Sequence, residues 1–352
     1  MPNEKRRKQV RQSRGDNGDK EEHKMGREWQ RRHAHDDGER EEGYHERVPP
    51  PALRKRMLQL LKLIGVALFL WILSRIDRDA LFLHLRNAEP LGIAASFLGL
   101  FLMYALKAAR WHVLVRSTGL TPSWMDSWRL FNIGIFLGAI TPANMGEMGR
   151  AAYLRRMGVH TGTALAIPLI DRIADVAIMG TVGIWSIGFL FGWQWSLITG
   201  CTGILGMGIV GILWERSKGL RAQEWLAFLQ ILARPPMLYG VLLWTILSWI
   251  VYFGWTFLLA QALGLSVSFP VLAAALTLTG ILVFIPIAPS GLGTREAALI
   301  TFLAPYGIAA PQAVALALVV FLLVIGSSTL GLWYWVRDGH RSPARTGACA
   351  RG

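Results

Sequence analysis

Long apolar runs constrain this chain more than any other feature. They follow one another from about residue 57 to residue 336, and several approach the ~20 residues that a helix needs to cross a bilayer. Lipid offers no hydrogen bonds to an exposed backbone, so each crossing segment must satisfy its own polar groups. The pattern predicts an all-α polytopic membrane protein, and a hydrophobic fraction of 53% agrees with that class.

The stretch from Ile281 to Leu303 departs from a plain spanning helix. Prolines and glycines interrupt its apolar sequence, and an arginine and a glutamate follow: Pro286, Pro289, Gly291, Gly293, Arg295 and Glu296. Proline breaks helices, and glycine permits close backbone approach. A broken segment at membrane depth must be buried in protein or face water. We therefore predict a functional re-entrant hairpin here.

A second stretch, residues 136–158, has the same construction, with an apolar run, a break, and then an acid and an arginine. Its corresponding residues are Pro142, Gly146, Glu147 and Arg150. Aligning Pro142 with Pro289 places Gly146 opposite Gly293. Transporters are often built from such internal repeats. The chain is therefore predicted to contain two related halves, each with one broken hairpin.

Six full spans plus these two hairpins are the preferred count, and eight plain spans are the alternative, because hydropathy does not separate them. Basic residues gather after the second and fourth spans and after the last one. Since basic loops favour the cytoplasm, both termini are expected there. One hairpin then opens from each face of the membrane, so the two halves form an inverted repeat.

Three regions are expected. Residues 1–56 form a charged cytoplasmic tail that lacks the apolar content for a core and is predicted to be disordered. Residues 57–336 form the transmembrane domain, and residues 337–352 form a basic cytoplasmic tail. In a membrane protein, the net charge of +14 is typical of cytoplasmic loops and contact with anionic lipid.

Several classes of partner are not expected. No aromatic–basic motif indicates a nucleic acid. Cys201 and Cys349 lack metal-ligand spacing, so we expect no metal site, and no motif indicates another cofactor.

The predicted third span carries Asp171, Arg172 and Asp175, and the two acids share one helical face while the arginine lies off it. This segment is either a water-exposed helix extension or a charged lining beside the first hairpin.

The sequence resembles the transmembrane, flippase-like family of lysylphosphatidylglycerol synthases. The resemblance covers about Leu58 to Val336. It rests on the helix end Lys107–Trp111 with Gly119, on PANMGEMGR at 142–150, on the segment Asp171–Asp175, and on PSGLGTREA at 289–297. The family implies lipid translocation in a bacterial plasma (inner) membrane.

In the two-domain members of that family, a cytoplasmic synthase domain transfers an aminoacyl group to phosphatidylglycerol. This chain ends soon after its last span, so we expect the short form, without aminoacyl transfer and without enzymatic activity. Relatives of this form are linked to other lipids, including hopanoids and polyprenyl-linked sugars. The expected partner is therefore a polar or anionic membrane lipid, made by a separate biosynthetic enzyme, and the oligomeric state is left open.

The charged residues of both hairpins are the candidates for substrate binding. Arg150 and Arg295 are expected to bind phosphate, because guanidinium forms charge-assisted, often bidentate bonds to it. Glu147 and Glu296 are expected to hold those arginines in the empty site or to bind a cationic headgroup. Further hydrogen bonds are expected from Asn144, from Ser290 and from the backbone amides near Gly146, Gly291 and Gly293. The alternative is that the charges neutralise one another in a packed core.

Two other functional classes stay open from the sequence. A membrane-embedded enzyme acting on a lipid-linked substrate would use Asp171 and Asp175 to bind a divalent ion. An accessory scaffold of a lipid or glycolipid pathway would use the loops and tails and would leave the charged hairpins without a role.

Overall fold

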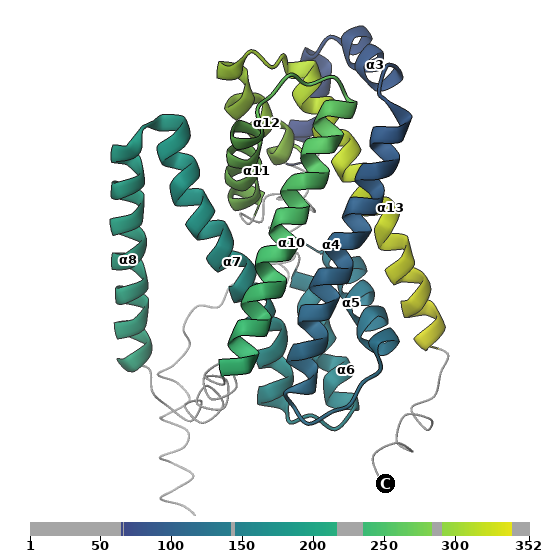
Figure 1. The fold of residues 1–352 in the computed structure, drawn as a ribbon, viewed down its shortest axis with the longest axis vertical. Coiled ribbons are helices and arrows are strands. Elements are labelled where there is room, and N and C mark those ends of the chain that lie inside the picture. Colours follow the sequence, from purple (N-terminus) through teal and green to yellow (C-terminus); the bar gives the residue numbers. More distant parts are fainter. Residues whose placement is uncertain (1–64, 66, 142–144, 217–234, 284–290, 340–352) are drawn as a thin grey trace, which may run out of the picture. The chain divides into compact units, whose positions relative to one another are not determined.

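The computed structural model describes residues 65, 67–141, 145–216, 235–283 and 291–339, all within one compact unit, Gln59–Gly352. Residues 67–75 are helical. The elements after them are α3 (Arg78–Arg86), α4 (Pro90–Arg116), α5 (Trp124–Ala139), η1 (Met145–Gly149), α6 (Arg150–Arg156), α7 (Thr161–Phe191), α8 (Trp193–Arg216), α10 (Pro235–Ala262), α11 (Phe269–Val283), α12 (Thr294–Leu303), η2 (Ala304–Tyr306) and α13 (Ala310–Gly339) (Figure 1). The predicted tail 1–56 and residues 340–352 lie outside the described residues.

Within those ranges, α4, α7, α10 and α13 are long and apolar enough to cross a membrane. Large apolar side chains on them face outward, among them Leu98, Leu243, Ile250 and Leu322. In water these exposed groups would be costly, whereas lipid tails accept them. The prediction of an all-α polytopic membrane protein is confirmed. Two further helices occupy apolar runs of the sequence, residues 67–75 before α3 and α8 after α7.

Among the described residues, neither predicted hairpin contains a helix of spanning length. The first consists of α5, η1 and α6, and the second of α11 and α12. Their longest helices have 16 and 15 residues, or about 24 and 22 Å at 1.5 Å per residue, against ~30 Å of hydrocarbon. In each hairpin the second arm packs back on the first. This is the geometry of re-entrant hairpins rather than of plain spans.

Two capping arrangements explain where hairpin helices begin. Ser123 and Asp126 form a capping box at the start of α5, in which each side chain accepts the backbone N–H of the other. At α12, the Glu296 carboxylate accepts the N–H of Gly293 at 2.6 Å. Gly293 has φ +83°, and a Cβ there would collide with the backbone of Gly65 and Phe69. Glycine is therefore required for both its conformation and its close contact with the first described helix.

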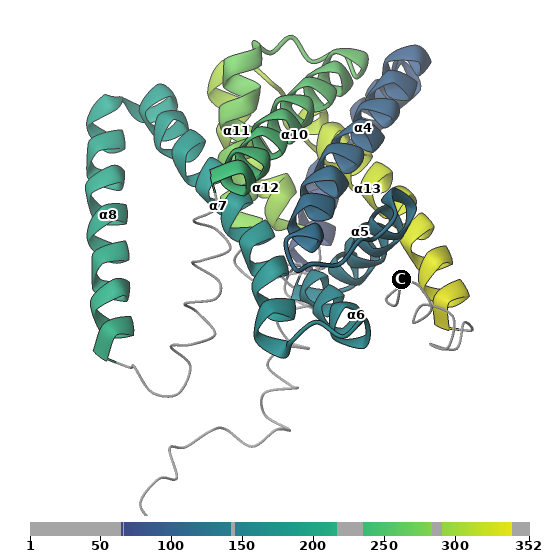
Figure 2. The ribbon, with the colours of Figure 1, turned by 60° about the horizontal axis from the view of Figure 1, so that its bottom comes forward.

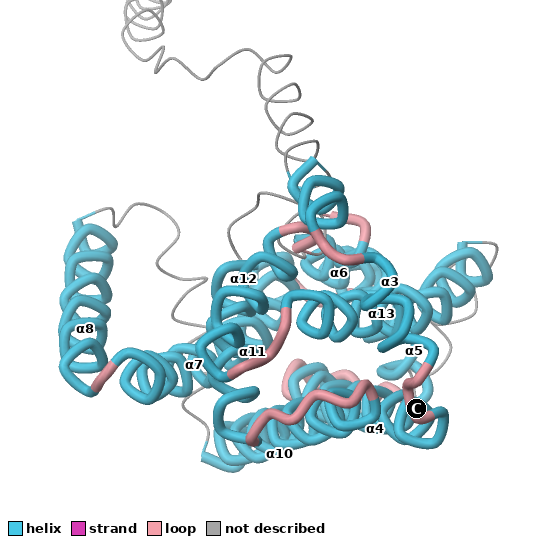
Figure 3. The backbone as a smooth tube through the Cα atoms, turned by 90° about the horizontal axis from the view of Figure 1, so that it is seen from above, coloured by secondary structure: helices cyan, strands magenta, loops and turns pink. Residues whose placement is uncertain are grey.

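Helices α4 and α10 lie side by side (Figure 3). Close pairs along their interface are Gly92 with Ala262, Gly99 with Trp255, and Val113 with Gly240. The numbers rise on α4 as they fall on α10, which fixes the antiparallel arrangement. Small residues at the contacts let the two backbones approach closely, as is usual between membrane helices.

The other contacts follow a reciprocal pattern. Helix α5 of the first hairpin packs on α13, the helix after the second hairpin (Figure 2). Conversely, α11 of the second hairpin packs on α7, the helix after the first. Pro142 and Pro289 are 147 positions apart, and adding 147 to the residue numbers carries α4, α5, α6 and α7 onto α10, α11, α12 and α13 within a few residues. Because α4 and α10 are antiparallel, the predicted inverted repeat is confirmed.

The α4–α10 contact predicts different outcomes for two glycine substitutions. A Cβ at Gly99 would lie 2.5 Å from Trp255 Cβ, an atom fixed close to its own backbone, whereas one at Gly254 meets no atom within 4 Å. Alanine favours helix formation by up to ~1 kcal/mol relative to glycine. We therefore expect Gly99→Ala to lower the melting temperature of the detergent-solubilised protein, and Gly254→Ala to leave it unchanged or raise it. Equal melting temperatures for the two variants would contradict the close contact.

Candidate functional site

A cluster of charged side chains lies inside the bundle, where α4, the first hairpin and α7 meet. Its members are Lys107 and Arg110 on α4, Glu147 on η1, Arg150 at the start of α6, and Asp171, Arg172 and Asp175 on α7. We call this set the charge chain. Because charges in a bilayer are costly unless paired, the contacts within the chain determine what it can do.

Arg110 holds the two α7 carboxylates. Its Nε lies 2.7 Å from Asp171 Oδ1, and its two terminal nitrogens lie 3.0 and 3.1 Å from the oxygens of Asp175. Nη1 also donates to Thr245 Oγ1 on α10 at 2.9 Å. The side chain of Arg110 is 1% exposed, so this fork of bonds replaces its hydration. One guanidinium thus ties α4 to both α7 and α10.

Arg150 continues the network into the first hairpin. Its Nη2 lies 3.1 Å from Asp171 Oδ2 and 3.0 Å from Glu147 Oε2, and its Nε donates to the Glu147 carbonyl oxygen at 3.1 Å. The guanidinium carbon also lies 4.4 Å from the centre of the Trp111 ring, a cation–π contact. A Cβ at Gly134 would lie 2.6 Å from Arg150 Cδ, so glycine on α5 makes room for this arginine.

The remaining cations stand at the two ends. Lys107 Nζ lies 3.0 Å from Asp175 Oδ2, and Arg172 pairs with Glu147. The charges therefore alternate in the order Lys107, Asp175, Arg110, Asp171, Arg150, Glu147, Arg172. This order gives four cations and three anions. The chain has one positive charge in excess, and a cation occupies each end.

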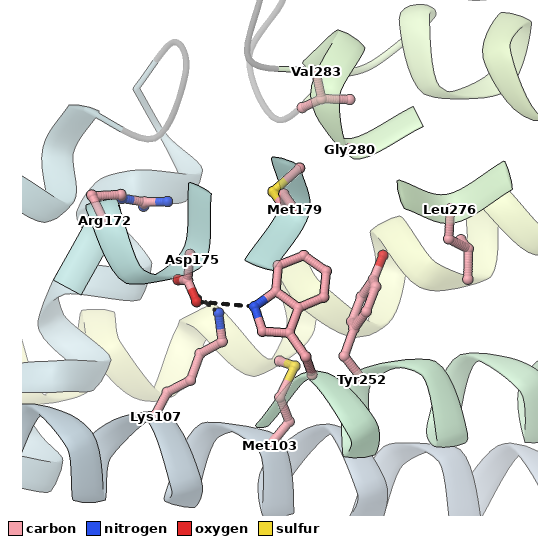
Figure 4. A pocket seen from close by; sticks show the side chains of 10 residues that line it. Met103, Lys107, Arg172, Asp175, Met179, Tyr252, Leu276, Gly280 and Val283 are labelled. Atoms are coloured by element: carbon pink, nitrogen blue, oxygen red, sulfur yellow. Dashed lines mark hydrogen bonds and ion pairs between the residues drawn. The ribbon is translucent and has the colours of Figure 1, made fainter. Parts of the chain in front are cut away.

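Both ends reach a single pocket of about 220 Å³ between α4, α7, α10 and α11 (Figure 4). Its polar lining is Lys107, Arg172, Asp175, Trp249 and Tyr252, and its apolar lining is Met103, Met179, Leu276, Gly280 and Val283. Trp249 Nε1 donates to Asp175 Oδ1 at 3.2 Å, and the Lys107 ammonium lies 5.8 Å from the Trp249 ring centre. The pocket therefore joins a cationic surface to an apolar one.

The structure brings five of the predicted site residues together, namely Glu147, Arg150, Asp171, Arg172 and Asp175. Asp171 and Asp175 are 3% and 7% exposed, so the interpretation of this segment as a water-exposed helix extension is wrong. Arg172, which the helical spacing placed off the acidic face, lines the same pocket as Asp175. Arg150 is buried within the network and does not belong to the described pocket lining.

The second hairpin contributes differently. Glu296 is buried and caps its own helix through Gly293. Arg295 lies within electrostatic range of Glu296 and of Tyr252, which lines the pocket. The predicted positions Asn144 and Ser290, with Pro142 and Pro289, lie outside the described residues. Gly146 donates its N–H to Thr141 Oγ1 at 2.7 Å, and Gly291, at φ +72°, accepts the N–H of Arg295 through its carbonyl.

Sequence reasoning did not assign a site role to Arg110, Lys107 or Trp249. The two basic residues entered only as part of the helix end Lys107–Trp111. A signal was present, because Lys107 and Arg110 lie three apart and share a face of α4, as Asp171 and Asp175 share one of α7. When two apolar helices carry opposite charges, each on one face, packing those faces together removes the cost of unpaired charges in the membrane.

The middle of the charge chain predicts a large effect of Asp171→Asn. That change leaves Arg110 and Arg150 buried with less compensating charge, and breaking a buried pair typically costs about 3–5 kcal/mol. We expect a strongly lowered melting temperature in detergent. Asp79→Asn, at an exposed residue of α3, serves as the control. Combining Asp171→Asn with Arg150→Met removes one charge of each sign and should recover part of the loss; full stability of Asp171→Asn alone would show that the pairing contributes little.

Comparisons with known proteins agree with this architecture. Part of the chain is similar to the UPF0104 membrane protein MJ1595 of Methanocaldococcus jannaschii, with 26% identity over 133 residues, which cover 37% of this chain and 40% of that relative. No solved structure matches the chain. The model of the family described as the lysylphosphatidylglycerol synthase TM region matches residues 59–331. Because this match covers most of its length, the chain belongs to the family of the lysylphosphatidylglycerol synthase TM region.

Proposed function

We propose that this membrane protein moves a lipid between the two leaflets and that the pocket between α4, α7, α10 and α11 receives the lipid headgroup. The observation that carries the proposal is the mixed pocket lining, in which charged and apolar side chains line the same space. A charged headgroup at the middle of a bilayer costs at least ~3 kcal/mol without a protein path. Polar groups inside the bundle lower that barrier, while apolar groups suit the lipid stem.

The depth of the pocket supports this use. Lys107 lies nine residues before the end of α4, and Asp175 lies fourteen residues after the start of α7, or about 14 and 21 Å along the helix axes. The polar lining is therefore well inside helices of spanning length rather than at their ends. Polar groups at that depth are better suited to bind a substrate that enters the membrane than a substrate that stays in water.

The inverted repeat supports movement rather than simple binding. Inverted repeats allow a transporter to open its binding site to one face of the membrane and then to the other. The pocket is lined from both halves, by α4 and α7 of the first and α10 and α11 of the second. A rearrangement of one half against the other would therefore change access to the headgroup. No ATP-binding motif is present in the sequence, so we leave the energy source open.

The setting of this activity is also part of the proposal. We place the chain in the bacterial plasma (inner) membrane, with its basic termini in the cytoplasm. A separate enzyme would supply the lipid. An enzymatic role for Asp171 and Asp175 as ligands of a divalent ion is less well supported, because Arg110 occupies oxygens of both carboxylates.

Reconstituted liposomes test the proposal. We expect the wild-type protein to accelerate exchange of fluorescent phosphatidylglycerol between leaflets, measured by reduction of the outer-leaflet label. Lys107→Gln and Arg172→Gln should each slow this exchange about tenfold, the size of one lost charge-assisted hydrogen bond. Both substitutions remove an end of the charge chain and leave alternating, paired charges, so the fold should persist.

Arg116→Gln is the matched control, because Arg116 is an exposed arginine on α4 outside the charge chain. It should exchange lipid at the wild-type rate. Unchanged rates in both Lys107→Gln and Arg172→Gln would remove the pocket from the proposal, and failure of the wild-type protein to move any lipid would refute lipid movement itself.

Arg295→Ala tests the second hairpin. We expect Arg295, which lies near Tyr252 of the pocket lining, to bind the lipid headgroup. The variant should then remain folded, with an unchanged melting temperature, and should lose most of the lipid exchange. A wild-type exchange rate would exclude this arginine from the transport path.

A further inference from the structure

We infer that the headgroup taken by this pocket is an anionic phosphate ester without an ammonium group. The inference rests on the proposed function and specifies the substrate class of the same site. It follows from three features of the charge chain: how its carboxylate oxygens are occupied, where its excess charge lies, and which side chains line the pocket around that charge.

Every carboxylate oxygen of the charge chain already accepts at least one donor. Asp171 accepts Arg110 and Arg150, one on each oxygen. Glu147 accepts Arg150 on one oxygen and pairs with Arg172 through the other. Asp175, the acid that lines the pocket, accepts four donors from three residues, which are Lys107, Arg110 and Trp249. An entering ammonium group would have to displace one of these bonds to reach a carboxylate.

The excess positive charge lies where a ligand would enter. Lys107 and Arg172 end the charge chain, and both line the pocket. The ammonium of Lys107 has three N–H donors, and it gives one to Asp175. The other charge-chain cations, Arg110 and Arg150, are 1% and 0% exposed and are held inside the network. A phosphate in the pocket would thus meet two terminal cations and neutralise the single excess charge.

The apolar lining indicates a lipid as the source of that phosphate. Met103 and Met179 lie one turn from Lys107 and Asp175 on the same helices, and Leu276 and Val283 line the pocket from α11 (Figure 4). A free phosphate ion would leave this apolar surface unused, whereas the ester-linked stem of a lipid would cover it. Met side chains adapt to irregular apolar ligands. An anionic phospholipid matches both the cations and the apolar lining, but a zwitterionic or cationic lipid brings an ammonium group against the cations.

A selectivity measurement tests the inference. Liposomes of one composition would contain traces of three lipids with the same fluorescent acyl chain: phosphatidylglycerol, phosphatidylcholine and a trimethylammonium lipid. We expect phosphatidylglycerol to exchange about tenfold faster than phosphatidylcholine and the cationic lipid to exchange most slowly. Lys107→Gln lowers the net charge of the chain to zero, so it should bring the phosphatidylglycerol rate close to that of phosphatidylcholine. Arg116→Gln should preserve the wild-type ratio.

The outcomes separate the inference from the proposed function. Equal rates for phosphatidylglycerol and phosphatidylcholine, or fastest exchange of the cationic lipid, would overturn the inference and leave lipid movement standing. Absence of exchange for all three lipids would overturn the proposed function. Excess inorganic phosphate should leave the phosphatidylglycerol rate unchanged, and inhibition by it would overturn the assignment of the site to a lipid phosphate rather than a free one.

Discussion

The arrangement of this bundle depends on one constraint, which is that charges removed from water must be paired. Arg110 shows its consequence most clearly, since a 1% exposed guanidinium bonds Asp171, Asp175 and Thr245. Apolar helices slide over one another at little cost in lipid, because no hydrophobic force holds them in register. The forked bonds of Arg110 and Arg150 require specific positions of α4, the first hairpin, α7 and α10. Buried ion pairs of this kind add little net stability, but breaking them is expensive. They therefore determine which packing of the helices is tolerated.

Much of the architecture could be predicted from the sequence. Apolar runs identified the membrane helices, and Pro142, Pro289 and the nearby glycines located both breaks. Their alignment predicted two related halves, and the positions of the basic residues predicted that the halves are inverted relative to each other. The pairing of charges was harder to predict, since it depends on which helices become neighbours. Glu296 illustrates the limit: besides lying near Arg295, its carboxylate caps α12 through the N–H of Gly293, a role that was not assigned from the sequence. Lys107 received no site role, because nothing in its own helix identifies Asp175 as its partner.

The two halves share a backbone plan but not a charge pattern. Adding 147 to the numbers of Arg110, Asp171 and Asp175 leads to Phe257, Leu318 and Leu322. The second half thus carries apolar residues where the first carries the charge chain, and its own charged pair, Arg295 and Glu296, lies at the hairpin. A membrane protein tolerates few buried charges. Because both halves line the same pocket, the one set of charges on the first half can serve it. This uneven distribution of charge places most of the charged side chains of the site on the first half.

That unevenness has an energetic consequence for the repeat. In a perfectly symmetric molecule, exchanging the packing of the two halves would produce a state of equal free energy, and the protein would populate both equally. Here the exchanged packing would present Leu318 and Leu322 where Asp171 and Asp175 now stand, so the two states differ in electrostatic energy. Unequal energies mean unequal populations. For the proposed transport, one of the two packings is therefore the resting state, and the side chains of α7 rather than the course of the backbone set this preference.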